Sequence, residues 1–175
     1  MTFHEIENQR ALIDRRAIAD RLSTLKPGKK LSGEALNVLR GTLEYGRAEI
    51  AKRLTLEPGN GRAAARATAF LHDQLVRLTY DFVTERVLDE PAEAVALVGL
   101  GGTGRGEMAP FSDLDLMFLT DKAPTAIQER AAEAMLHLLW DLKLKVGHSV
   151  RSVPQLMAFA KKDMTTERVD LNEAA

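Results

Sequence analysis

The residues best suited to chemistry are a run of glycines and two aspartates that follow it closely. Five glycines occupy the eight positions from Gly99 to Gly106, directly after a short apolar run. Glycine lets the backbone approach a ligand closely, and successive backbone N–H groups often bind phosphate. Ten residues separate Gly102 from Asp113, and Asp113 and Asp115 lie at the start of a second apolar run. The spacing predicts a phosphate-binding turn beside a pair of carboxylates.

Two carboxylates at positions i and i+2 of a strand point to the same face. Burying such charges without partners costs on the order of several kcal/mol. A divalent cation offsets this cost, and carboxylate oxygens suit Mg²⁺. We therefore predict that Asp113 and Asp115 hold Mg²⁺ and that the glycine turn holds a nucleoside triphosphate against it. The alternatives are that Asp113 caps a turn and that Asp115 is an ion-paired strand residue.

Two other glycine motifs fit the sequence less well. Residues 99–104 match the dinucleotide-binding pattern G-x-G-x-x-G, and Asp121 lies near the expected position of the ribose-binding acid. That fold needs a full helix before the next strand, and residues 105–113 are too few and include Pro110. A P-loop needs Lys followed by Ser or Thr, where this chain has Arg105 followed by glycine.

Three segments, in order, resemble one protein family. The first is LVGLGGTGRGEMAPFSDLDLMFL, the second LLWDLKLKVGHSVRSV and the third KKDMTT, and together they lie within residues 94–166. The first resembles the nucleotidyltransferase superfamily of DNA polymerase beta. All three look more specifically like the bacterial PII uridylyltransferase (uridylyl-removing enzyme) family.

The resemblance implies an Mg²⁺-dependent enzyme that transfers UMP from UTP to a tyrosine of the PII signalling protein, in the regulation of nitrogen metabolism. It places metal binding and catalysis on Asp113 and Asp115. Gly101 and Gly102 fall on the nucleotide-binding glycine pair, and Ser112 directly precedes the aspartates, as in the family pattern. Arg105 is the nearest cation to the glycines, so it is a candidate phosphate contact, although an arginine in a loop is often solvated.

Departures from the family pattern leave other functions open. The superfamily commonly uses a third carboxylate on a later strand, but residues 143–151 contain none; Asp141 and Asp163 flank them. The family also continues into a hydrolase domain and ACT domains, which do not follow here. One alternative is therefore a truncated, inactive fragment that binds nucleotide or PII protein without turnover. Another is transfer from a different nucleotide such as ATP, because the spacing does not select the base.

The apolar pattern predicts the elements that position these residues. The first half has helical periodicity, and the second half mixes short apolar runs with one amphipathic helix. The fold class is therefore α/β (α+β), with N-terminal helices followed by a small mixed-sheet nucleotidyltransferase core. The expected divisions are a helical region 1–91, a core 92–166 and a truncated tail 167–175. The expected elements are helices 4–22, 125–142 and 155–162, two helices on either side of residues 57–61, and strands 94–98, 114–119 and 143–153.

Composition excludes several classes of protein. The 175 residues contain 24 Lys plus Arg and 25 Asp plus Glu, a net charge of −1, so charge alone cannot hold a nucleic acid. The absence of cysteine excludes disulfides and thiolate metal sites. No apolar run is long enough to cross a membrane, and the first ten residues lack the apolar core of a signal peptide. We therefore expect a cytoplasmic protein with no nucleic-acid or membrane partner.

Overall fold

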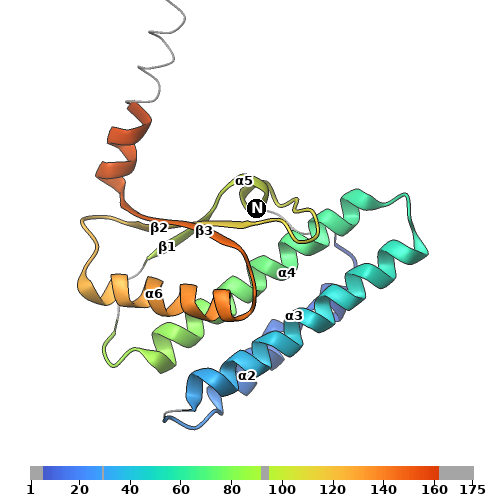
Figure 1. Ribbon diagram of the computed structural model, residues 1–175, viewed down its shortest axis with the longest axis horizontal. Coiled ribbons are helices and arrows are strands. Elements are labelled where there is room, and N and C mark those ends of the chain that lie inside the picture. The colour runs from blue at the N-terminus through green and yellow to red at the C-terminus, as the bar shows by residue number, and fades with distance from the viewer. Residues whose placement is uncertain (1–5, 29, 92–94, 162–175) are drawn as a thin grey trace, which may run out of the picture.

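Helices gather on one side of a small sheet (Figure 1). The computed structural model describes residues 6–28, 30–91 and 95–161. The first half contains α1 (Gln9–Leu12), α2 (Arg15–Ser23), α3 (Leu31–Leu56), α4 (Gly61–Phe82) and the π-helical turn η1 (Val83–Val87). The second contains β1 (Ala96–Gly99), α5 (Gly101–Arg105), β2 (Leu114–Thr120), α6 (Ala126–Asp141) and β3 (Val146–Ser152). Residues 153–161 are helical as well. The predicted fold class is confirmed.

The single helix predicted over residues 4–22 is wrong, because the chain turns at its middle. Ile13 is extended, with φ −161°, and it separates α1 from α2. The carboxylate of Asp14 accepts a hydrogen bond of 3.2 Å from the N–H of Ala17 and so caps the start of α2. Leu12 and Ile13 are buried at this turn. The apolar periodicity continues across the break, which is why periodicity alone did not reveal it.

Helices α3 and α4 form an antiparallel pair joined by the predicted turn. Asn60 ends this turn; its side chain accepts from the N–H of Ala63 at 3.4 Å and donates to Glu57 at 3.0 Å. Helix α4 lies centrally and has buried residues along its whole length, from Ala64 to Phe82. One hydrophobic cluster runs from α1 through α4 to the sheet and α6, so helices and sheet share a core.

The sheet has the order β1-β2-β3, with β1 antiparallel and β3 parallel to the central strand β2. Side chains alternate along β2. Leu114, Leu116 and Phe118 are at most 3% exposed and belong to the shared core, on the side where Figure 1 shows α4 and α6. Asp115 therefore projects from the opposite face. Asp113 lies just before the strand and is exposed.

Helix α6 connects β2 to β3 and begins with a capping box. Thr125 and Gln128 exchange hydrogen bonds between their side chains and backbone N–H groups, at 2.9 and 3.4 Å. Leu136 is buried. Trp140 is 41% exposed, and its ring contacts the ring of His148 on β3 edge to face, at 5.8 Å between centroids.

His72 is a buried histidine within α4, only 2% exposed. Neither ring nitrogen has a hydrogen-bond partner among the residues the structure describes. Burial, with a smaller contribution from the charge of Arg47, lowers the pKa of His72 to about 4. Protonation therefore favours the unfolded chain, in which the histidine pKa is near 6.5.

We expect this histidine to make the protein acid-sensitive. As the pH falls from 7 to about 4, the free energy of unfolding should drop by up to about 3 kcal/mol on account of His72 alone. His72→Leu should remove this part of the pH dependence, as measured by urea unfolding at pH 7 and pH 4.5. His137→Gln, on the exposed face of α6, is the control and should behave as wild type. Equal pH dependence in His72→Leu and wild type would contradict the assignment.

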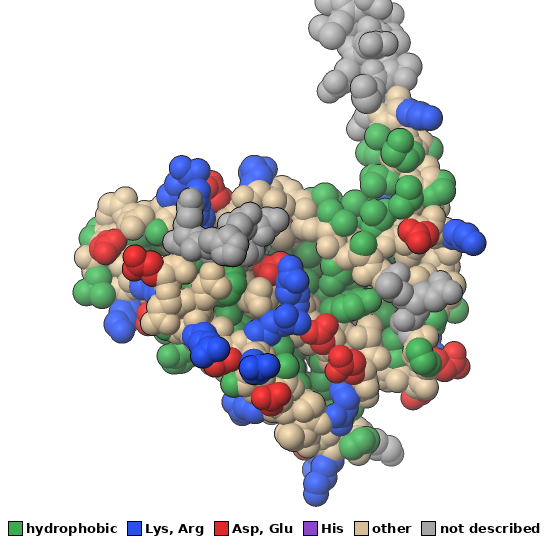
Figure 2. Space-filling model, turned by 180° about the vertical axis from the view of Figure 1, so that it is seen from behind, with side chains coloured by type: hydrophobic (Ala, Val, Ile, Leu, Met, Phe, Trp, Pro, Cys, Tyr) green, Lys and Arg blue, Asp and Glu red, His purple; other side chains and the backbone are tan. Residues whose placement is uncertain are grey.

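The surface carries charges of both signs. On the face seen in Figure 2, Lys and Arg side chains alternate with Asp and Glu. Apolar side chains gather along helical residues 153–161, where Val153, Met157 and Phe159 are 40–54% exposed. None of the helices in the described ranges is both long enough and apolar enough to cross a membrane.

Candidate functional site

The carboxylate of Asp115 lies between two glycines from different elements. Strand register places Gly147 of β3 directly beside Asp115. A Cβ atom added to Gly147 would lie 2.6 Å from one carboxylate oxygen, and a Cβ added to Gly101 would lie 2.9 Å from the other. Both distances are shorter than a van der Waals contact. The carboxylate therefore fits here only because neither position has a side chain.

The predicted glycine loop is a single turn of helix, α5. The N–H of Gly104 donates to the carbonyl of Leu100 at 2.8 Å, and Gly106, with φ 72°, ends the turn in the left-handed conformation. Two hydrogen bonds join α5 to β2. The N–H of Asp115 donates to the Thr103 hydroxyl at 3.3 Å, and the N–H of Leu100 donates to the Asp115 carbonyl at 2.9 Å. Of the predicted glycine pair, Gly101 is thus brought beside Asp115, whereas Gly102 lies against the backbone of Glu107.

The two predicted metal-binding aspartates suit a divalent cation. Asp115 is partly buried, and no ion pair within residues 6–28, 30–91 and 95–161 involves Asp113 or Asp115. A hard cation such as Mg²⁺ accepts carboxylate oxygens as ligands and would neutralise them. Among these same residues no group of three potential metal-binding side chains is present.

The other residues predicted for the site lie at the ends of helices, in a turn or outside the described residues. Arg105 is exposed at the end of α5. The hydroxyl and the N–H of Ser112 both donate to the carbonyl of Ala109, at 2.9 and 3.2 Å, so Ser112 closes the turn before Asp113. Asp141, one candidate for a third carboxylate, is exposed at the end of α6; the other, Asp163, lies outside the described residues.

Comparison with known proteins identifies the family. A family model described as "Putative nucleotidyltransferase DUF294" matches residues 47–148, more than half of the chain. The chain belongs to this nucleotidyltransferase family. The matched region begins inside α3 and contains α4, α5, both aspartates of the site and the beginning of β3.

Curated relatives of this nucleotidyltransferase carry one shared name, bifunctional uridylyltransferase/uridylyl-removing enzyme. The protein from Novosphingobium aromaticivorans is 46% identical over 166 residues, which cover 91% of this chain and 18% of the relative. Those from Azospirillum brasilense and Rhodospirillum rubrum are 41% and 39% identical, over 91% and 94% of this chain. The chain spans about a fifth of the length of these relatives. No solved structure shows significant similarity to it.

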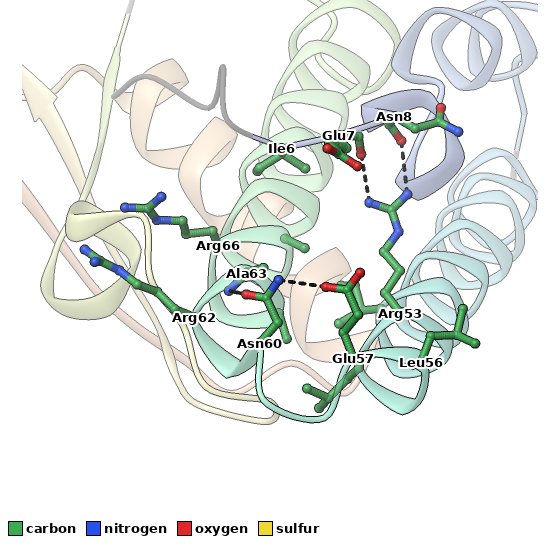
Figure 3. Close-up of a pocket in the computed structure, with 14 residues that line it drawn as sticks. Ile6, Glu7, Asn8, Arg53, Leu56, Glu57, Asn60, Arg62, Ala63 and Arg66 are labelled. Atoms are coloured by element: carbon green, nitrogen blue, oxygen red, sulfur yellow. Dashed lines mark hydrogen bonds between the residues drawn. The ribbon is translucent and has the colours of Figure 1, made fainter.

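A cavity of about 470 Å³ lies in the helical half of the chain (Figure 3), and neither Asp113 nor Asp115 lines it. Arg53 borders it and donates to the carbonyls of Glu7 and Asn8, at 2.8 and 3.2 Å. Arg62 and Arg66 also border it, and both guanidinium groups bind Glu107. The guanidinium groups of all three arginines thus contact other parts of the chain at the border of the cavity.

Sequence reasoning did not single out Gly147 or Glu107. A glycine inside a strand often marks a close approach of another group, and this was the available signal for Gly147. Its partner across the sheet could be known only from the strand register. Glu107 follows the glycine stretch directly, but its ion pairs with Arg62 and Arg66 join residues more than 40 positions apart.

Proposed function

We propose that this nucleotidyltransferase transfers UMP from UTP to a tyrosine of the PII signalling protein, with Mg²⁺ held by Asp113 and Asp115. The observation that carries the proposal is the position of Asp115. Its partly buried carboxylate contacts the glycine helix α5 on one side and Gly147 on the other, and no cation among the described side chains pairs with it. The names of the relatives support uridylyl transfer.

The chemistry follows from the residues around Asp115. In the transfer, the tyrosine oxygen bonds to the α-phosphorus of UTP, the bond to the β-phosphate oxygen breaks, and pyrophosphate leaves while the hydroxyl proton passes to solvent. Mg²⁺, when bound, neutralises the charge that develops on the phosphates. Asp113 and Asp115 would hold the ion, and the backbone of Gly101 and Gly102 would approach the phosphates. Arg105 and Ser112 are the proposed additional contacts with the nucleotide.

The direct test is transfer of label from [α-³²P]UTP to purified PII protein. We expect labelling of PII with Mg²⁺, none with EDTA, and much weaker labelling from [α-³²P]ATP. A PII variant with its acceptor tyrosine changed to Phe is the control for site-specific transfer. Equal or better labelling from ATP would contradict the choice of UTP, and labelling unaffected by EDTA would contradict the metal.

Nucleotide binding without turnover is the second candidate. It is favoured by the absence of a third metal-binding side chain beside the two aspartates in the described part of the chain. Calorimetry distinguishes it from transfer. Mg²⁺-dependent binding of UTP, lost in the Asp113→Asn/Asp115→Asn double variant but without labelling of PII, would support a binding domain.

A further inference from the structure

We propose that Glu107, held by Arg62 and Arg66, is a positioning residue that fixes the glycine helix α5 beside Asp115. The inference rests on the proposed function, in which α5 binds the nucleotide phosphates. It gives the helical first half a role in the site, because both arginines belong to α4.

The side chain of Glu107 binds α4 at two points one helical turn apart. One of its carboxylate oxygens accepts from Nε of Arg62 at 2.8 Å and from Nε of Arg66 at 3.3 Å. Arg62 and Arg66 point to the same side of α4, toward the segment that contains α5 (Figure 3). The Arg62 hydrogen bond is the main cause that lowers the pKa of Glu107, with Arg66 contributing, so the carboxylate is charged at neutral pH.

The backbone of Glu107 contacts α5. Its N–H donates to the carbonyl of Gly102 at 3.1 Å, and its own carbonyl oxygen lies 2.9 Å from the position that a Cβ of Gly102 would take. The next residue, Met108, is 1% exposed, and its N–H donates to the carbonyl of Ala65 in α4 at 3.0 Å. Residues 107 and 108 therefore join α4 to the glycine helix through both side chain and backbone.

Helix α5 needs such support. It has five residues, three of them glycine, and none is buried. Glycine is the poorest helix former after proline, and one turn of helix is too short to be stable alone. The position of α5 must therefore come from its neighbours. On one side the Thr103 hydroxyl and the N–H of Leu100 bind β2, and on the other side Glu107 connects α5 to α4.

A positioning role differs from a role in global stability. The side chains of Glu107 and Arg66 are 38% and 33% exposed, and that of Arg62 is 72% exposed. Ion pairs as exposed as this contribute little to folding. The chain offers a matched control in the pair of Arg15 with Asp81, at 2.7 Å, which joins α2 to α4 with side-chain exposures of 44% and 41%. Asp81 makes the same kind of contact with an arginine but lies outside the candidate site.

The test compares Glu107→Ala with Asp81→Ala by hydrogen exchange without nucleotide and by kinetics with UTP. Both variants should lower Tm by no more than about 4 °C. In Glu107→Ala alone, the amides of Gly104, Gly106 and Met108 should exchange at least about 10-fold faster, since local opening becomes easier. The KM for UTP should rise at least about 5-fold while kcat changes less than about 2-fold, because the loss acts on nucleotide binding. Glu107→Gln, which keeps the shape, should give a smaller shift in the same direction.

Each outcome separates the inference from the proposed function. Unchanged exchange in Glu107→Ala would overturn the inference, as would faster exchange with an unchanged KM for UTP. Equal effects in Asp81→Ala would also overturn it, since the role would then be general stability. The proposed function fails separately, if the wild type neither binds UTP nor transfers UMP. Faster exchange confined to α5 in Glu107→Ala would then still show that Glu107 fixes α5.

Discussion

Asp115→Asn should abolish UMP transfer, with a loss of at least about 1000-fold, because the amide cannot replace the charge of a metal-binding carboxylate. The fold should be unaffected. The side chain has nearly the same shape, and neither of its oxygens takes part in an ion pair among the described residues. The measurement is labelling of PII at saturating UTP, together with the thermal unfolding of both proteins.

The unfolding measurement also tests metal binding independently of the activity assay. Added Mg²⁺ should raise the Tm of the wild type when UTP is present and should leave the Tm of Asp115→Asn unchanged. Asp20→Asn is the matched control, because this carboxylate is exposed on α2, and the variant should behave as wild type in both assays. Normal transfer by Asp115→Asn would refute the assignment of the site.

Gly147→Ala should reduce transfer about 100-fold, although no charged residue is substituted. The added methyl group would lie 2.6 Å from the Asp115 carboxylate, which must then move. A displacement of about 1 Å at a reacting centre costs about 100-fold in rate. The backbone of Gly147 is outside the left-handed region, so alanine itself causes no strain there. The measurement is kcat/KM for UTP.

The control for this substitution is Gly41→Ala in α3. A Cβ at Gly41 has nothing within 4 Å, so alanine should raise the free energy of unfolding by up to about 1 kcal/mol and leave transfer unchanged. A Gly147→Ser variant should lose at least as much activity as Gly147→Ala. If Gly147→Ala transfers UMP at the wild-type rate, the carboxylate does not act from the position described.

The sequence predicts the strands better than the helix boundaries. The apolar run 114–119 covers all of β2 except Thr120, and the segment 143–153, which alternates in part, contains β3. The helix predicted over 4–22 contained a cap at Asp14 that only the local backbone reveals. Residue 94, where the first strand was expected to begin, lies outside the described residues, and β1 begins at Ala96.

For the candidate site, local spacing predicted that the glycines and the aspartates belong together. Gly101 and Asp115 do lie together, since the turn between them is short. Gly147 lies beside Asp115 only because two strands separated by a helix pair with each other. Arg62 reaches Glu107 only because α4 packs beside α5. Such contacts depend on the whole core, so the sequence around each residue does not reveal its partner.

The two contacts of Asp115 also determine where the chain tolerates a change in length. The chain from Asp115 to Gly147 is more than twice as long as that from Gly101 to Asp115. Because the entropy of loop closure grows only with the logarithm of length, each doubling costs about 0.6 kcal/mol. Insertions in residues 121–125, before α6, therefore cost little. The shorter connection is fixed midway, where Met108 binds Ala65, so one added residue between Met108 and Asp113 would shift both aspartates relative to the glycines.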